Sequence, residues 1–165
     1  MEAIFRCQKC GTCCRNLVKN VGNVTIGLFL TSKETHLFPS KLIFPQISVG
    51  VNKPEKTIAY QLNVYACPHI NDKNECMIYD KRPLVCKSFP LEITPIEVIM
   101  HRECPVIAVL VKEGEARRIG WSAVEIKANQ KIRMYMSNRY ERYFKVGLKA
   151  WTFDLRSKEW IRTSK

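Results

Sequence analysis

The sequence contains no long apolar run, and it lacks the short motifs that mark the common enzyme classes. Its 165 residues include no stretch near the ~20 apolar residues that a membrane-spanning helix needs. There is also no glycine-rich phosphate loop, no GxSxG turn, no HExxH helix and no pair of acids spaced for glycoside hydrolysis. These absences favour a soluble binding protein over an enzyme, but they leave open an enzyme that works through a metal centre.

The first residues, MEAIFRC, lack the basic region, apolar core and small-residue cleavage site of a secretion signal. We therefore expect a cytoplasmic protein, in which clustered cysteines stay reduced and bind metal more often than they form disulfides. A hydrophobic fraction of 46% and a charged fraction of 25% are ordinary for a globular chain. The length suits one domain over residues 1–165 with a real hydrophobic core.

Cysteine is abundant, with eight in the chain, and four of them fall in the stretch FRCQKCGTCCRN. These four are Cys7, Cys10, Cys13 and Cys14. Cysteines three positions apart in a turn can direct their sulfurs at one point roughly 2 Å away, which is the geometry that a metal requires. Gly11 gives the loop the conformational freedom to close. The spacing predicts metal ligation by this segment.

A second group of cysteines, Cys67, Cys76, Cys86 and Cys104, lies in or near the proline-rich block CPHINDKNECMIYDKRPLVCKSFP. Together with the N-terminal stretch, this block resembles the CxxCxxCC family of zinc- or iron-chelating domains, which includes the YkgJ-like proteins. The resemblance rests on the N-terminal motif with Gly11, on Cys67-Pro68, on residues 76–90 and on Cys104-Pro105. It implies chelation, for which all eight cysteines are candidates.

The sequence leaves zinc and iron open, but the spacing favours an iron–sulfur cluster of the [4Fe–4S] type. Cys7, Cys10 and Cys13 match the three-ligand loop of bacterial ferredoxins, whose remote ligand precedes a proline, as Cys67 and Cys104 do. Structural zinc sites usually pair two short knuckles, and the second knuckle is missing here. One or two sites are possible, since the adjacent pair Cys13 and Cys14 fits neither pattern.

Three other side chains are candidates for the neighbourhood of the metal. Arg82 lies within the block that carries the family resemblance. It is our candidate for a residue that contacts and orients the metal ligands without binding the metal itself. His69 and His101 are close in sequence to Cys67 and Cys104, so either is an alternative ligand in a mixed site. His36 is expected to be a surface or packing residue rather than a ligand.

The apolar pattern predicts an α+β fold, a small antiparallel sheet with flanking helices and irregular cysteine-bearing loops organised by metal. We expect a strand within residues 21–30 and a short helix over 31–38, opened by a capping box between Thr31 and Glu34. Residues 42–51 and 57–65 should form a hairpin. A further strand over 96–104 would place Cys67 and Cys104 on one edge of the sheet.

Residues 112–165 form a basic, aromatic C-terminal extension with 14 Lys and Arg against 6 Asp and Glu. Ser122 and Glu125 have capping-box spacing, which predicts a helix from there to Gly147 that docks on the sheet through Ile132, Met136, Tyr140 and Tyr143. Its other face would carry Lys127, Lys131, Arg133, Arg139, Arg142 and Lys145. Residues 151–162, with Trp151, Phe153 and Trp160, are expected as a final strand or an arm.

Basic residues interleaved with aromatics are typical of RNA-binding surfaces, which use cations for phosphates and rings for unpaired bases. The C-terminal third therefore makes RNA or a ribonucleoprotein, such as the ribosome, a candidate partner. The alternative is an ordinary amphipathic helix with its aromatics in the core. The preferred hypothesis is a metal-organised binding protein. The alternatives are an RNA-associated protein, a cluster-dependent enzyme and an electron-transfer protein.

Overall fold

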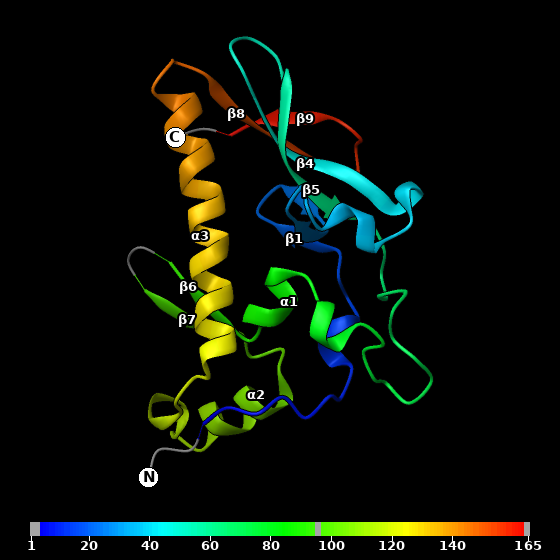
Figure 1. The fold of residues 1–165 in the computed structure, drawn as a ribbon, viewed down its shortest axis with the longest axis vertical. Coiled ribbons are helices and arrows are strands. Elements are labelled where there is room, and N and C mark those ends of the chain that lie inside the picture. The colour runs from blue at the N-terminus through cyan, green and yellow to red at the C-terminus, as the bar shows by residue number, and fades with distance from the viewer. Residues whose placement is uncertain (1–3, 95–96, 164–165) are drawn as a thin grey trace. The chain divides into compact units, whose positions relative to one another are not determined.

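A computed structural model describes residues 4–94 and 97–163 and shows an α+β fold (Figure 1). Its contacts group the chain into two compact units. The cysteine unit comprises Met1–Arg15 and His69–Arg133, and the sheet unit comprises Asn16–Pro68 and Met134–Lys165. The predicted fold class is confirmed. Its organisation by metal, and a single domain over residues 1–165 with 112–165 as an extension, stay predictions.

The sheet unit contains a five-stranded antiparallel sheet in the order β3-β5-β4-β8-β9. The strands are β3 (Leu28–Leu30), β4 (Ile43–Gly50), β5 (Lys56–Leu62), β8 (Lys149–Phe153) and β9 (Trp160–Arg162). The predicted hairpin is confirmed as β4 and β5, and residues 151–162 contribute strands rather than an arm. Leu17, Leu30, Phe38 and Leu62 form the buried core of this unit.

A buried glutamine amide, Gln61, joins three segments of the sheet unit. Its Oε1 accepts a hydrogen bond from the Gly27 amide at 2.7 Å. Its Nε2 donates to the carbonyl oxygens of Pro45 at 2.7 Å and Phe153 at 3.1 Å. A Cβ at Gly27 would lie 2.2 Å from the carbonyl oxygen of Leu62, so only glycine fits there. Because every buried polar atom of this amide is paired, the network fixes the register of these strands.

Two predictions for the first part of the sheet unit need correction. Residues 21–30 do not form one strand. A turn at Gly22, with φ of 59°, follows β1 (Lys19–Val21), and Gly27 separates β2 (Val24–Ile26), which pairs with β1, from β3, which pairs with β5. The Thr31–Glu34 contact does form, since Glu34 Oε2 accepts from the Thr31 amide at 2.8 Å and from its hydroxyl at 2.7 Å. Only a 3₁₀ helix over Thr35–Leu37 follows it, and no α-helix occurs between residues 31 and 38.

The cysteine unit is built from short elements, several of which the sequence analysis missed. They are α1 (Leu84–Ser88), β6 (Leu91–Ile93), β7 (Val98–Met100), α2 (Pro105–Lys112) and 3₁₀ helices over Thr12–Cys14, Tyr79–Lys81 and Ala116–Arg118. The strand expected over 96–104 ends at Met100, and residue 96 lies outside the described residues. Phe5, Cys104 and Ile107 form the buried core, and the Phe5 ring lies 5.3 Å from Trp121.

Helix α3 (Ala123–Phe144) begins as predicted. The Val124 amide donates to Ser122 Oγ at 3.2 Å, and Glu125 accepts from the Ser122 amide at 3.1 Å. After the helix, Gly147 adopts a φ of 78°, and the Leu148 amide bonds back to the Tyr143 carbonyl at 3.2 Å. Among the described residues no helix combines the length and the apolar character that crossing a bilayer requires.

The side chains that anchor α3 differ from those that the apolar periodicity of the sequence predicted. In the cysteine unit, Asn129 Nδ2 donates to the Leu91 carbonyl at 3.0 Å and Oδ1 accepts from the Ile93 amide at 3.1 Å. In the sheet unit, the Tyr135 hydroxyl donates to the Ile58 carbonyl at 2.7 Å. Ile132, Met136 and Tyr143 are only half-buried, and the side chain of Tyr140 lies outside the described part. Docking therefore uses polar anchors that a search for apolar positions passes over.

Candidate metal centre

The N-terminal cysteine loop turns at Gly11, which adopts a φ of 73° immediately before the 3₁₀ helix Thr12–Cys14. This is left-handed backbone, which glycine adopts without cost. A Cβ at this position would lie 2.8 Å from both the Cβ of Asn74 and the Cδ1 of Ile70. The turn therefore requires glycine at position 11 for two reasons: the left-handed backbone angle and the close approach to the loop around residue 74.

That second loop carries Cys76 and is held in shape by asparagines. The Asn71 side-chain oxygen accepts from the amides of Lys73 at 3.0 Å and Glu75 at 2.8 Å. Asn74 adopts a φ of 63° and accepts a hydrogen bond from Arg15 Nη2 at 2.7 Å. Because Arg15 directly follows Cys14, this bond ties the end of the N-terminal loop to the loop that leads to Cys76.

Tyr79 and Arg82 form a polar layer beside the first cysteines. The Tyr79 hydroxyl interacts with the Cys7 thiol, and Lys9 Nζ lies 4.9 Å from the centre of the Tyr79 ring. Burial raises the pKa of Tyr79, and the positive charge of Arg82 opposes that rise. Arg82 also acts electrostatically on Cys13. The structure thus places Arg82 next to a candidate ligand, and its supporting role stays a prediction.

Cys104 is buried at the start of α2, where it is the N-cap residue. Burial raises the pKa of its thiol, while the backbone amides of Ile107 and Val106 at the helix N-terminus favour the thiolate. The thiol also interacts electrostatically with Cys10 and Cys7. Cys104 also shares the buried core with Phe5, so the start of α2 lies close to the N-terminal segment that leads to Cys7.

The remaining cysteines occupy three different settings. A hydrogen bond with the Cys14 thiol raises the pKa of Cys13. Cys86 is half-buried within α1, and Cys67 belongs to the sheet unit, where it packs against the core around Leu62. The prediction that Cys67 and Cys104 share one sheet edge is wrong. Cys67 follows a strand of the five-stranded sheet, whereas Cys104 lies after the separate hairpin of β6 and β7 and begins a helix.

The donor set fits a thiophilic metal, although the thiols are not gathered at one point. None of the eight cysteines forms a disulfide, and thiolate sulfur is the preferred donor for both zinc and iron–sulfur clusters. Within residues 4–94 and 97–163, no three His, Cys, Asp or Glu side chains converge as metal ligands do. The thiols instead approach one another in smaller groups, Cys13 with Cys14 and Cys104 with Cys7 and Cys10.

A comparison with known protein families identifies the family to which this cysteine pattern belongs. The family model described as CxxCxxCC, putative zinc- or iron-chelating domain, matches residues 6–105. The chain belongs to the CxxCxxCC family. The matched segment contains all eight cysteines of this CxxCxxCC protein and covers more than half of its length. Searches of curated proteins and of solved structures found no match.

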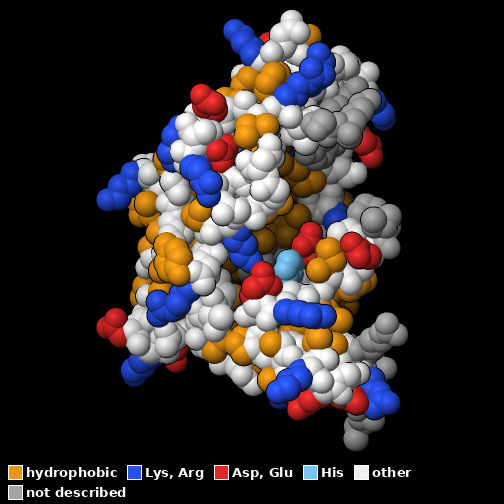
Figure 2. Space-filling model, turned by 180° about the vertical axis from the view of Figure 1, so that it is seen from behind, with side chains coloured by type: hydrophobic (Ala, Val, Ile, Leu, Met, Phe, Trp, Pro, Cys, Tyr) orange, Lys and Arg blue, Asp and Glu red, His pale blue; other side chains and the backbone are white. Residues whose placement is uncertain are grey.

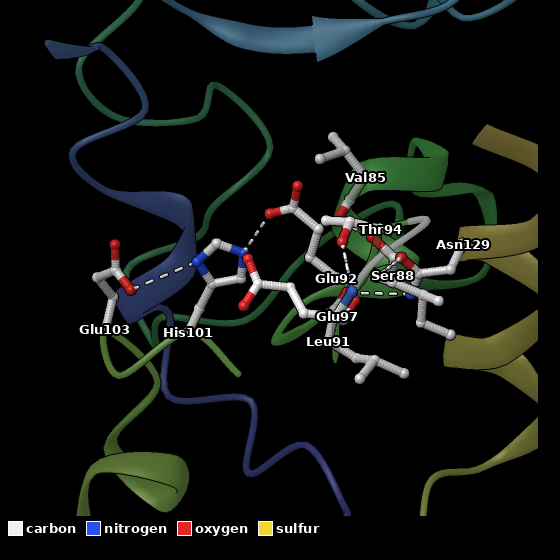
Figure 3. Close-up of polar contacts among 10 residues, drawn as sticks. Val85, Ser88, Leu91, Glu92, Thr94, Glu97, His101, Glu103 and Asn129 are labelled. Carbon is white, nitrogen blue, oxygen red and sulfur yellow. Dashed lines mark hydrogen bonds and ion pairs between the residues drawn. The ribbon is translucent and has the colours of Figure 1, made fainter. Parts of the chain in front are cut away.

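The histidines of this CxxCxxCC protein are arranged differently from the cysteines. His101 Nε2 lies 3.0 Å from Glu92 Oε2, and its Nδ1 lies 3.7 Å from Glu103 Oε2 (Figure 3). Its ring also stacks on Phe89 with 5.7 Å between the ring centres. Both ring nitrogens thus face carboxylates, a geometry that gives no support to His101 as a metal ligand. His36 is exposed, as expected.

The basic residues predicted on α3 of this CxxCxxCC protein lie in different surroundings. Lys127 and Lys131 line a cavity of the cysteine unit, whereas Arg139 and Arg142 line a cavity of the sheet unit. Arg133 and Lys145 are exposed and line neither. Figure 2 shows Lys and Arg side chains spread over one face of the molecule and interspersed with Asp and Glu. On that face the positive charge is divided rather than continuous.

The aromatics of residues 151–162 have packing roles. The Phe153 ring lies 6.3 Å from Phe44 and 5.2 Å from Trp160, ring centre to ring centre. Trp151 is half-buried within β8. These rings favour the packing alternative over base stacking. Lys56 and Tyr79, which line the two cavities, were not predicted, because only their position in the fold distinguishes them from other surface residues.

Proposed function

We propose that this protein chelates iron, as an iron–sulfur cluster held by its cysteines, with zinc as the alternative occupant. The observation that carries the proposal is that Cys104 shares a buried cluster with Phe5, which lies two residues before Cys7 in the N-terminal segment. A three-cysteine loop with a remote cysteine followed by proline is the ligand pattern of bacterial ferredoxins. Membership of one compact unit, which the N-terminal loop and Cys104 share and to which Cys67 does not belong, supports Cys104 as the remote ligand.

The metal would act first as an organiser of the cysteine unit. Three separate segments carry thiols there, the loop over 7–14, the block over 76–86 and the start of α2, while the buried apolar core is small. Because the thiols approach one another only in small groups, ligation would draw these segments together, and metal binding would contribute folding free energy. A bound cluster would supply one-electron redox chemistry, so electron transfer and cluster-dependent catalysis remain the alternative functions.

Elemental analysis and a visible spectrum of protein purified without oxygen and without added metal test this proposal. Iron with matching sulfide and a broad band near ~400 nm would support the cluster. Colourless zinc at one or two ions per chain would support the alternative occupant. A monomeric, folded protein that holds neither metal after reconstitution under both conditions would overturn chelation as the function.

A second candidate function, RNA or ribonucleoprotein binding, has an observation of its own in the sheet unit. We infer it from a cavity of ≈ 380 Å³ lined by Lys56, Arg139 and Arg142 together with Tyr135 and Tyr143, with no carboxylate in its lining. A hydrogen bond with Lys56 and the charges of Lys56, Arg142 and Arg139 lower the pKa of Tyr143. Cations beside tyrosine rings are suited to phosphates and unpaired bases.

Measuring single-stranded RNA affinity across a range of salt concentrations tests the second candidate. Changing Arg139, Arg142 and Lys145 to Glu should weaken binding strongly and reduce the slope of log K against log salt by about 2. A control with the same change in charge, Lys33, Lys41 and Lys53 to Glu, alters exposed lysines outside this cavity. If the first variant binds RNA as well as the control does at low salt, this surface is not the RNA site.

A further inference from the structure

The cysteine unit contains a cavity of ≈ 340 Å³ between the 79–87 segment and the first half of α3. Four cations line it, Arg82 and Lys87 from one side and Lys127 and Lys131 from the helix. Asp80 is the single carboxylate among its lining residues. The cavity is therefore strongly positive, and it is separate from the cavity considered above for RNA.

The three lysines of this cavity carry charges that the rest of the described chain does not neutralise. The side-chain ammonium groups of Lys87, Lys127 and Lys131 form no ion pair and no hydrogen bond with any residue in the described ranges. Lys127 and Lys131 are one helical turn apart, a spacing at which like charges repel each other. Directing several cations at one cavity costs electrostatic free energy unless an anion occupies it.

Arg82 is held in the orientation that anion recognition requires. Its guanidinium carbon lies 3.7 Å from the centre of the Tyr79 ring, and its Nε donates to the Tyr79 carbonyl at 2.7 Å. These two contacts fix the plane of the guanidinium group. A fixed, planar guanidinium is the group that best matches the oxygens of a phosphate, and lysines add point charges around it.

We propose that this cavity binds the terminal phosphate of a small phosphorylated ligand. A phosphate monoester is largely dianionic at neutral pH, so it matches four cations and one carboxylate better than a singly charged diester does. The volume admits a small ligand and not a folded partner. The same Arg82 and Tyr79 that line the cavity also approach Cys13 and Cys7, so the bound phosphate would lie beside the cysteine segment.

Calorimetric titration of the protein as purified with methyl phosphate and with dimethyl phosphate tests the charge preference. We expect saturable binding of the monoester and at least about tenfold weaker binding of the diester. Ribose 5-phosphate and a 5′-phosphorylated RNA trinucleotide would then show whether the phosphate comes from a metabolite or an RNA end, and binding of either supports the proposal. Absence of saturable binding to the three probes that carry a terminal phosphate, or equal binding of methyl phosphate and dimethyl phosphate, would overturn it.

A matched pair of variants assigns the binding to the cavity. Replacing Lys127 and Lys131 with Gln should weaken methyl phosphate binding about tenfold or more, because two charged donors are lost. Both lysines are exposed, so the change leaves the packing intact. Arg133→Gln removes a cation from the same helix outside the cavity and should leave binding unchanged. Equal affinities for the double variant and the wild type, or equal losses in both variants, would contradict the assignment.

Discussion

The guanidinium group of Arg82 stacks on the ring of Tyr79, with 3.7 Å from its central carbon to the ring centre. Each partner also acts on a different cysteine, since Tyr79 interacts with Cys7 and Arg82 interacts with Cys13. The segment over residues 79–82 therefore contributes a hydroxyl group and a positive charge to the surroundings of the N-terminal cysteine loop. A pair that orients candidate ligands in this way should influence how tightly they bind metal.

Changing Arg82 to Lys should lower metal affinity about tenfold or more. The variant keeps the positive charge but loses the planar group that stacks on Tyr79 and donates from Nε. Competition with a chromophoric chelator measures the affinity. Lys81→Ala, at an exposed position next to it, provides the control. Equal affinities of the Arg82 variant and the wild type would show that charge alone, and not orientation, acts on the ligands.

Changing Cys104 to Ser should reduce the metal content and lower the melting temperature of the loaded protein. Serine is a better N-cap residue than cysteine, so any loss of stability cannot come from a weakened start of α2. Cys10→Ser should act in the same direction, because both thiols belong to the proposed ligand set. Gln8→Ala, an exposed change in the same loop, is the control.

Elemental analysis and thermal unfolding before and after chelation separate these effects. The wild type and Cys104→Ser should differ more in melting temperature when loaded than after the metal is removed, because the cost of the buried serine hydroxyl is present in both states. Full metal content and an unchanged melting temperature in both cysteine variants would mean that the metal is held by other thiols.

Changing Gly11 to Ala should destabilise the protein more than changing Gly114 to Ala. Both glycines have nearly the same left-handed φ, 73° and 75°, so both substitutions cost about 1 to 2 kcal/mol of backbone strain. A Cβ at Gly11 also meets Asn74 and Ile70 at 2.8 Å, which adds about 1 to 3 kcal/mol. A Cβ at Gly114 meets nothing within 4 Å.

Urea unfolding of the two glycine variants under identical metal conditions measures the difference. The Gly11 variant should also bind metal more weakly, because its N-terminal loop can no longer rest against the loop that leads to Cys76. Equal destabilisation in both variants would show that the two loops are not packed together as the structure has them.

The elements that sequence analysis predicted well are those with strong local signals. The β4–β5 hairpin follows from two β-rich runs around a turn, and the start of α3 follows from Ser122 and Glu125. Helix α2 was missed because its residues, with Val106 and Val109 among them, are as typical of strands as of helices. The signal that would have found it is Pro105, which occupies the first helical position.

The candidate site was predictable in its residue types but not in its geometry. The spacing within the N-terminal loop predicts Cys7 and Cys10 as ligands, because residues three positions apart in a turn are close in space whatever the rest of the fold. The approach of Cys104 to them depends on how the segments between fold, which no local pattern encodes. The anchoring role of Asn129 was equally invisible, since a buried polar residue breaks the apolar periodicity by which helix faces are predicted.

Asp154 should make the stability of the protein sensitive to acid. Its carboxylate accepts hydrogen bonds from the Ser157 hydroxyl at 2.6 Å, the Ser157 amide at 2.8 Å and the Thr25 amide at 2.7 Å. These bonds hold the pKa of Asp154 well below its usual value. Because the folded pKa is depressed, the stabilisation is present above the unfolded pKa of about 4 and is lost as the pH falls below it.

Changing Asp154 to Asn should therefore lower the free energy of unfolding at pH 7 and weaken its dependence on pH below about 4. Urea unfolding at a series of pH values, with the wild type measured in parallel, gives both quantities. Asp72→Asn is the control, because that carboxyl is exposed and belongs to the other unit. The contrary result would be an equal loss of unfolding free energy in the wild type and the Asp154 variant between pH 5 and pH 3. It would mean that the turn between β8 and β9, and its contact with Thr25 of β2, do not depend on the Asp154 carboxylate. The acid sensitivity would then have to come from other groups of the sheet unit.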